Sequence, residues 1–335
     1  MKPNRPAQGG QRGKRTSGTG RARTSGTQPT TGRTGGSGGT ARGTGTGGAA
    51  AGRGRSGSQQ FSSRGAGRTG RVAAPGERPK TTSEKTLGGE QVEGRQAVRE
   101  LLIGGTRKVR ELWVSGELVD SEPLADIIEI ARSMRVQVTE VARKRLESQA
   151  RSEAPQGIIA FAAPLQEVEL SDLLKRRRND PPFLVAVDGV TDPGNLGALL
   201  RCCDGAGVHG VVLPRHRAVH ITPTAAKSAA GAVEHVPMAL VGGLPAALGR
   251  MKEAGIWVVG LADEADRSLF ELGDLARDGI CLVMGAEGSG LSRLVRERCD
   301  LIVGIPMRGR LSSLNVSAAA ALATYEVTRQ RSTGR

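Results

Sequence analysis

Three loops rich in glycine or proline carry the polar side chains best suited to chemistry. They span residues 188–201, 284–292 and 305–317, and each follows a short apolar run that is typical of a buried β-strand. Open α/β sheets bind their ligands beyond the carboxyl ends of the strands, which is where these loops begin. The three loops therefore predict one site for a polar ligand.

Five side chains in these loops are candidates for catalysis. Asn195 stands near a predicted helix start, and Arg201 follows about two turns later, where a guanidinium could clamp a phosphate. Glu287 is the single acid of the second loop, whose glycines free backbone N–H groups for a ligand. Ser313 and Asn315 precede the last predicted helix. Each has a structural alternative, since Ser313 and Asn315 could be helix caps and Glu287 a salt-bridge partner.

The glycines match neither common nucleotide-binding motif. Gly285, Gly288 and Gly290 have the order G-x-x-G-x-G instead of G-x-G-x-x-G, and no G-x-x-x-x-G-K-[ST] sequence occurs. The four cysteines include no C-x-x-C pair and no histidine at metal-ligand spacing, so we expect no metal site. Adjacent Cys202 and Cys203 are expected to pack in the core.

Residues 183–335 are predicted to form an α/β domain with a mostly parallel sheet. Apolar strands are predicted at 183–187, 210–213, 257–261, 281–284 and 301–305, with helical stretches between them. This alternation is typical of a parallel sheet covered on both faces. The last helix, from about Leu314, is rich in alanine and could pack on its own sheet or on a second subunit.

A smaller α/β module is predicted at residues 87–164. Its expected strands are 110–115, 135–141 and 157–162, and its expected helices are 94–102 and 123–134. Residues 165–182 are charged and end in a proline pair, which suits an interdomain linker. The basic run 175–178 within them is either solvated or in contact with RNA.

The first 86 residues differ in composition from the rest of the chain. They hold seventeen Lys and Arg against two Glu, a formal charge of +15 that equals the net charge of the whole chain. A segment of Gly, Thr, Ser and Arg lacks the apolar surface needed to fold, so we predict a disordered basic tail. We expect it to bind RNA phosphates. A solubilising tail or an organelle transit peptide are the alternatives, although no amphipathic helical period is present.

The three loops, in this order and spacing, resemble motifs one, two and three of the SpoU family of RNA ribose 2′-O-methyltransferases. The resemblance covers residues 183 to about 330. The segment 87–164 resembles the family's N-terminal substrate-binding domain, which is similar to a ribosomal-protein RNA-binding fold. The basic tail does not belong to the family pattern.

The resemblance implies a SPOUT-type catalytic domain with a deep trefoil knot. It also implies S-adenosylmethionine as cofactor, bound by the backbone around Gly285, Ile305 and Leu314. By the same resemblance, Arg201 is the residue that activates the ribose hydroxyl. Because a guanidinium is a poor base, we expect Arg201 to orient the phosphate and stabilise the developing alkoxide. The motif-one, motif-two and motif-three polar residues of the family correspond to Asn195, Glu287, Ser313 and Asn315.

The family's sites lie at a dimer interface, so the resemblance implies a homodimer. The module at 87–164 is similar to the branch that methylates a guanosine in the peptidyl-transferase loop of 23S ribosomal RNA. Transfer-RNA methylation, methylation of a ribosomal adenosine as in thiostrepton resistance, and a non-catalytic role in ribosome assembly are the alternatives. No apolar run is long enough to span a bilayer, and we expect a soluble, cytoplasmic protein.

Overall fold

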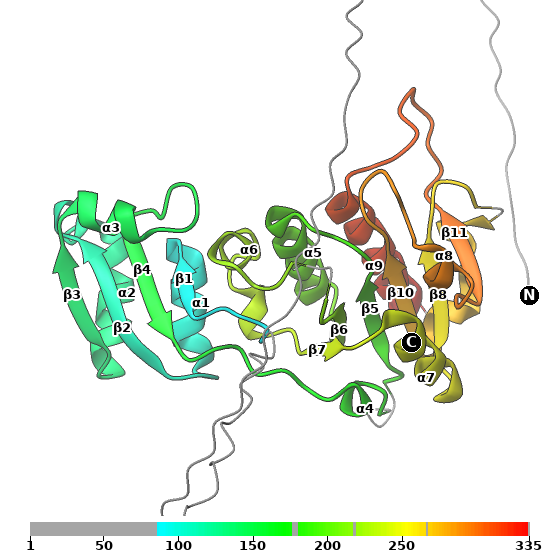
Figure 1. Cartoon of the computed structure of the whole chain (residues 1–335), viewed down its shortest axis with the longest axis horizontal. Coiled ribbons are helices and arrows are strands. Elements are labelled where there is room, and N and C mark those ends of the chain that lie inside the picture. Colours follow the sequence, from blue (N-terminus) through cyan, green and yellow to red (C-terminus); the bar gives the residue numbers. More distant parts are fainter. Residues whose placement is uncertain (1–85, 176–179, 217–218, 266, 334–335) are drawn as a thin grey trace, which may run out of the picture. The chain divides into compact units, whose positions relative to one another are not determined.

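The computed structural model describes residues 86–333, apart from 176–179, 217–218 and 266. The predicted basic tail and most of the basic run at 175–178 lie outside the described residues. The described residues contain two β-sheets, one of four strands and one of seven (Figure 1). All of them belong to one compact unit of the chain, which spans residues 77–335.

The smaller sheet has the strand order β1-β4-β2-β3. Strand β4 runs antiparallel to both of its neighbours, whereas β2 and β3 are parallel. Helices α1 and α2 share the larger core of this sheet, and α3 contributes to a smaller cluster with Trp113 and Phe161. Its elements are β1 (Gln91–Glu93), α1 (Arg95–Gly104), β2 (Val109–Ser115), η1 (Gly116–Leu118), α2 (Glu122–Ser133), β3 (Gln137–Val141), α3 (Arg143–Gln149) and β4 (Ile158–Ala162).

The larger sheet is parallel throughout, with the order β7-β6-β5-β10-β8-β11-β9. The five strands predicted from apolar runs are all present, so the prediction of an α/β fold with a parallel sheet is confirmed. Two further strands, β7 and β9, were not predicted. The strands are β5 (Phe183–Val187), β6 (Gly210–Pro214), β7 (Met238–Val241), β8 (Trp257–Leu261), β9 (Arg267–Ser268), β10 (Ile280–Met284) and β11 (Leu301–Gly304).

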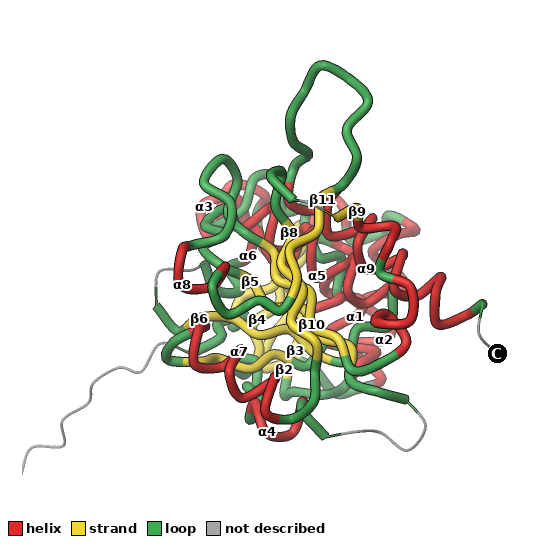
Figure 2. The backbone as a smooth tube through the Cα atoms, turned by 90° about the vertical axis from the view of Figure 1, so that its right-hand side faces the viewer, coloured by secondary structure: helices red, strands yellow, loops and turns green. Residues whose placement is uncertain are grey.

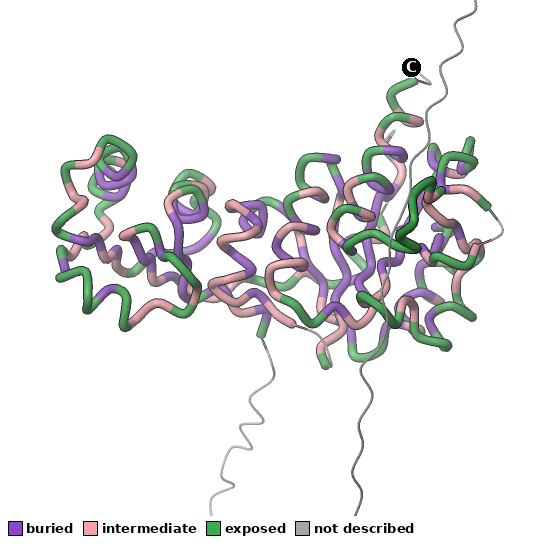
Figure 3. Tube along the Cα trace, turned by 90° about the horizontal axis from the view of Figure 1, so that it is seen from above, coloured by how far each residue is buried: buried purple, intermediate pink, exposed green. Residues whose placement is uncertain are grey.

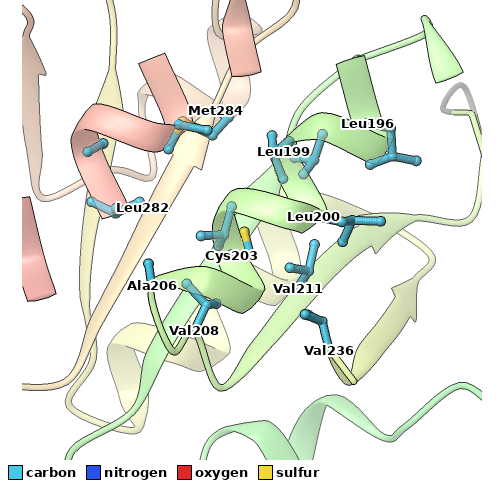
Figure 4. Close-up of a cluster of buried hydrophobic side chains, with 14 of the residues drawn as sticks. Leu196, Leu199, Leu200, Cys203, Ala206, Val208, Val211, Val236, Leu282 and Met284 are labelled. Carbon is cyan, nitrogen blue, oxygen red and sulfur yellow. The ribbon is translucent and has the colours of Figure 1, made fainter. Parts of the chain in front are cut away.

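Helices cover both faces of the larger sheet, whose strands are largely buried (Figure 3). One core contains residues of α5, α6 and α9, and Figure 4 shows its centre, where Leu199 and Cys203 of α5 lie near β6 and β10. The other core contains residues of α4, α7 and α8. These elements are α4 (Leu170–Leu173), α5 (Pro193–Gly205), α6 (Pro223–Ser228), η2 (Ala232–Glu234), α7 (Leu244–Glu253), η3 (Leu269–Glu271), η4 (Gly273–Arg277), α8 (Arg293–Arg296) and α9 (Val316–Ser332).

The alanine-rich helix α9 packs on its own domain. Its buried residues, including Ala320 and Ala323, join the core that contains α5 and β10. Leu322 and Tyr325 on another side of the helix remain exposed, at 42% and 52%. One face of α9 therefore packs in the core, while another is exposed to solvent in the single chain.

The segment at 165–182 is packed against the larger sheet where the structure describes it. Leu170 and Leu173 of α4 are buried in its second core, and the N–H of Val168 donates to the carbonyl of Met238 at 2.9 Å. This portion therefore makes more contacts with the larger sheet than its charged sequence indicated. Among the described residues, no helix is both long and apolar enough to cross a membrane.

Candidate active site

The second and third sequence loops line one cavity of about 610 Å³, and the first loop reaches it through the bond between Asn195 and Asn315. Strands β10, β8 and β11 are neighbours in the sheet, so the segments that follow their carboxyl ends come together there. The loop between β11 and α9 extends away from the sheet before it joins α9 (Figures 1 and 2). The cavity lining includes six of the predicted residues: Gly285, Glu287, Ile305, Ser313, Leu314 and Asn315.

One further wall of the cavity is formed by residues that the sequence did not predict. Leu261 ends β8, and it lines the cavity together with Ala262, Asp263 and Glu264 and with the second and third loops. The strand β8 itself was predicted, and the rule that ligands bind beyond strand ends applies to it equally. No glycine or proline marks this segment, which is why it was not singled out.

Gly285 has the shape that its loop requires. A Cβ atom built on it would lie 2.3 Å from the carbonyl carbon of Gly290 and 2.6 Å from the N of Leu291. Ala286 and Gly290 exchange two backbone hydrogen bonds, at 2.9 and 3.0 Å, which close the loop into a tight turn. Gly290 has a φ of 62°, which is unfavourable for other residues. Only glycine at 285 allows the two strands of this turn to approach so closely.

Asn315 joins the three loops through its side chain. Its Nδ2 donates to Oε1 of Glu287 at 2.6 Å and to Oδ1 of Asn195 at 2.9 Å. Its Oδ1 caps α9 by accepting from the N–H of Ser317 at 2.9 Å and from the Ser317 hydroxyl at 2.5 Å. The amide therefore caps α9 and contacts the other two loops at once. This contact brings one predicted residue from each loop into a single cluster.

Asn195 is fixed at the start of α5 by its own backbone. Its N–H donates to Oδ1 of Asp192, the N-cap residue, at 2.6 Å. Pro193 in the first turn supplies the backbone angle that a helix start needs. The side chain of Asn195 is thus held toward Asn315, although Asn195 is not itself part of the cavity lining.

Arg201 lies apart from this cluster in the single chain. It is exposed on α5 and does not belong to the cavity lining. Its neighbour Cys202 donates to the carbonyl of Ser317 at 3.8 Å, so this part of α5 adjoins the first turn of α9. Of the eight predicted site residues, Arg201 alone neither lines the cavity nor bonds to a residue that does.

The cysteines have structural surroundings. Cys203 and Cys281 are buried in the two cores, and burial raises the pKa of both thiols well above their ordinary value. Burial also raises the pKa of Cys299 to about 11. The expectation of core packing holds for Cys203, while Cys202 is half-buried. In the part of the chain that the structure describes, no cluster of His, Cys, Asp and Glu is suited to hold a metal ion.

Comparison with known proteins agrees with this arrangement. The family model of the SpoU rRNA Methylase family matches residues 182–325. The model described as RNA 2′-O ribose methyltransferase substrate binding matches residues 91–168. Both matches fall on the described sheets, the first on the larger sheet and the second on the smaller one.

Individual relatives align over most of their own length. The 23S rRNA (guanosine-2′-O-)-methyltransferase RlmB of Escherichia coli is 41% identical over 72% of this chain and 99% of its own. YacO of Bacillus subtilis, described as a TrmH-family tRNA/rRNA methyltransferase, is 41% identical over 72% and 96%. The crystal structure of the SpoU methyltransferase AviRb from Streptomyces viridochromogenes, in complex with the cofactor AdoMet, has a TM-score of 0.62 at 29% identity over 73% and 91%. The chain therefore belongs to the SpoU rRNA methylase family.

Proposed function

We propose that this protein transfers a methyl group from S-adenosylmethionine to the ribose 2′-hydroxyl of a guanosine in the peptidyl-transferase loop of 23S ribosomal RNA. The observation that carries the reaction is the hydrogen-bonded cluster of Asn195, Glu287 and Asn315, of which Glu287 and Asn315 line the cavity. The substrate is supported by the alignment with RlmB, which includes nearly all of that enzyme.

The residues of the cavity fit S-adenosylmethionine. A volume of about 610 Å³ lies within the range of sites for ligands of this size. The 285–290 turn presents backbone groups, and the carboxylates of Asp263, Glu264 and Glu287 suit a ligand that carries a positive sulfur and an ammonium group. Arg296, also in the lining, suits the carboxylate of the same ligand. When bound there, the cofactor supplies an electrophilic methyl group.

The chain's own residues position the nucleophile. Methyl transfer would require the ribose oxygen to be held close to the methyl group that the cofactor would supply. Asn315 fixes the direction of the Glu287 carboxylate and of Asn195, so the polar wall of the site is set before RNA binds. Arg201 holds a flanking phosphate and stabilises charge on the ribose oxygen.

The proposal includes a homodimer and the deep trefoil knot of the family. The exposure of Arg201 outside its own chain's cavity supports a dimer, because a guanidinium placed there can serve the cavity of a second subunit. Apolar exposure points the same way: Leu311 and Leu314 of the third loop are 75% and 38% exposed, and Leu322 and Tyr325 of α9 are also open. Sedimentation of the purified protein measures the oligomeric state.

The smaller sheet is proposed to bind the RNA substrate, in line with the family model that matches it. Transfer-RNA methylation is the second candidate, since the similar protein YacO is named a tRNA/rRNA methyltransferase. Mapping 2′-O-methylation across ribosomal and transfer RNA, in cells with and without the gene, decides between them. A missing methyl group in the 23S peptidyl-transferase loop supports the proposal, and an unchanged 23S pattern contradicts it.

A further inference from the structure

The guanidinium of Arg107 binds three separated parts of the chain. Arg107 lies between α1 and β2, and its side chain is 3% exposed. Its Nη1 donates to the carbonyls of Gly89 and Ala163, both at 2.6 Å. Its Nε and Nη2 donate to the two carboxylate oxygens of Glu234, at 2.9 and 2.6 Å. The parallel pair of bonds is the strongest geometry available to these groups.

The two carbonyls mark where the chain enters and leaves the smaller sheet. Gly89 lies two residues before β1, and Ala163 immediately follows β4, so the chain on either side of the smaller sheet passes through these positions. Two connecting segments without contacts between them could bend as a hinge. Arg107 binds both connecting segments and joins them to Glu234. Glu234 lies in η2, beside α6, in the domain of the larger sheet, which is called the catalytic half below.

Glu234 makes this connection specific. Its side chain is fully buried, and a buried carboxylate is stable only when a cation and hydrogen bonds compensate it. The pair spans 127 residues, and neither partner lines the cofactor cavity. The ion pair joins the segment after α1 to η2 and so connects the two sheet domains.

Neighbouring contacts fit the same junction. Lys227 of α6 donates to the carbonyls of Glu153 and Ala154, the latter at 2.7 Å, and α6 lies beside β1 (Figure 1). Gly231 has a φ of 96°, and a Cβ atom on it would lie 2.2 Å from Cβ of Glu100 in α1. The surfaces are therefore fitted closely around the ion pair.

We propose that Arg107 and Glu234 form an interdomain clamp that sets the reach between the RNA-binding sheet and the methyl-transfer cavity. They are positioning residues: with the clamp closed, RNA bound by the smaller sheet presents one nucleotide to the cavity. This inference rests on the proposed function and deepens it, since it assigns the choice of nucleotide partly to the junction.

The test compares Arg107→Lys and Glu234→Gln with Arg331→Lys. Arg331 is a matched control because its guanidinium also binds backbone carbonyls, those of Ala276, Pro181 and Asp278, but only within the catalytic half. Each full-length variant is measured by thermal melting, S-adenosylhomocysteine calorimetry, and kcat and KM on a folded 23S rRNA fragment. Hydrogen exchange follows two amides at the junction. The N–H of Gly89 donates to the carbonyl of Ile221, and the N–H of Ile221 donates to the carbonyl of Leu87.

For the clamp variants we expect at least a ten-fold loss of kcat/KM on RNA, faster exchange at the junction, and cofactor affinity within two-fold of the parent. Arg331→Lys should lower the melting temperature without that loss. The proposal is overturned if the clamp variants keep the parental kcat/KM, or if Arg331→Lys loses as much at an equal drop in melting temperature. Should Glu234→Gln fail to fold, Arg107→Lys retains the charge and carries the test. If the parent protein methylates no 23S rRNA, the proposed function fails, whereas the exchange measurement still judges the clamp.

Discussion

The carboxylate of Asp188 accepts a hydrogen bond from the backbone N–H of Ser292 at 2.7 Å, across 104 residues of sequence. Asp188 directly follows β5, and Ser292 ends the glycine turn that lines the cavity. The N–H of Asp188 also donates to the carbonyl of Met284, the last residue of β10, at 2.8 Å. Asp188 therefore ties both ends of the 285–291 turn to the strand beside it.

We expect Asp188→Ala to weaken S-adenosylhomocysteine binding roughly ten-fold, since hydrogen bonds to charged groups contribute about 1.5–3 kcal/mol. Asp188→Asn retains an acceptor oxygen and should recover most of the affinity. Asp300→Ala is the control, because Asp300 likewise accepts from a backbone N–H, that of Val258 at 2.9 Å, but lies outside the cavity lining. Calorimetry on all three variants measures the effect, and equal losses in Asp188→Ala and Asp300→Ala would refute a local role.

Gly285→Val should abolish cofactor binding while the protein remains folded. The added side chain would collide with the backbone of Gly290 and Leu291, so the turn must open, whereas the cores on either side of the sheet are untouched. Gly309→Val in the third loop is the control, because nothing lies within 4 Å of a Cβ there. Undiminished affinity in Gly285→Val, measured calorimetrically beside a thermal melt, would show that the pocket is elsewhere.

The large sheet could be predicted from sequence because its strands are buried on both faces. Runs such as β5 and β10 are continuously apolar, which periodicity analysis detects directly. The strand β9 has only two residues at the sheet edge and carries no apolar signal. Tertiary pairing alone makes it a strand.

The site was predictable in its composition but not in its contacts. From the sequence, Asn315 could be a helix cap or a site residue. In the structure its Oδ1 caps α9, and its Nδ2 donates to Glu287 in the cavity lining. The pairing of Arg107 with Glu234 has no sequence signal, because nothing in the periodicity of either segment relates residues 127 positions apart.

Deletion of residues 1–86 should leave cofactor affinity unchanged and weaken RNA binding. The segment carries a formal charge of +15, and each phosphate that it neutralises releases counterions, so its removal should flatten the dependence of log affinity on log salt. RNA binding by the full-length and truncated proteins is measured between about 50 and 200 mM salt, the range in which this effect is large. Identical slopes would leave the segment a solubilising role only.

Arg201→Ala should lower methyl transfer by orders of magnitude and leave cofactor affinity within a few-fold of the parent. The reason is separation: Arg201 is exposed on α5, outside the cavity that holds the predicted cofactor residues. Arg201→Lys should restore little, because an ammonium keeps the charge but lacks the planar fork that can hold a phosphate and the ribose oxygen together.

The proposed homodimer makes the role of Arg201 directly testable. Mixing inactive Arg201→Ala with inactive Gly285→Val subunits yields some heterodimers in which one cavity has an intact cofactor turn and faces an intact Arg201 of the other subunit. If Arg201 serves the partner's cavity, such mixtures should regain up to about a quarter of the parental single-turnover amplitude, the statistical share of intact sites after random exchange, half of the dimers being mixed with one intact site each. No recovery after verified subunit exchange would place Arg201 on its own chain's cavity or outside catalysis, and a near-normal rate for Arg201→Lys would show that charge alone suffices.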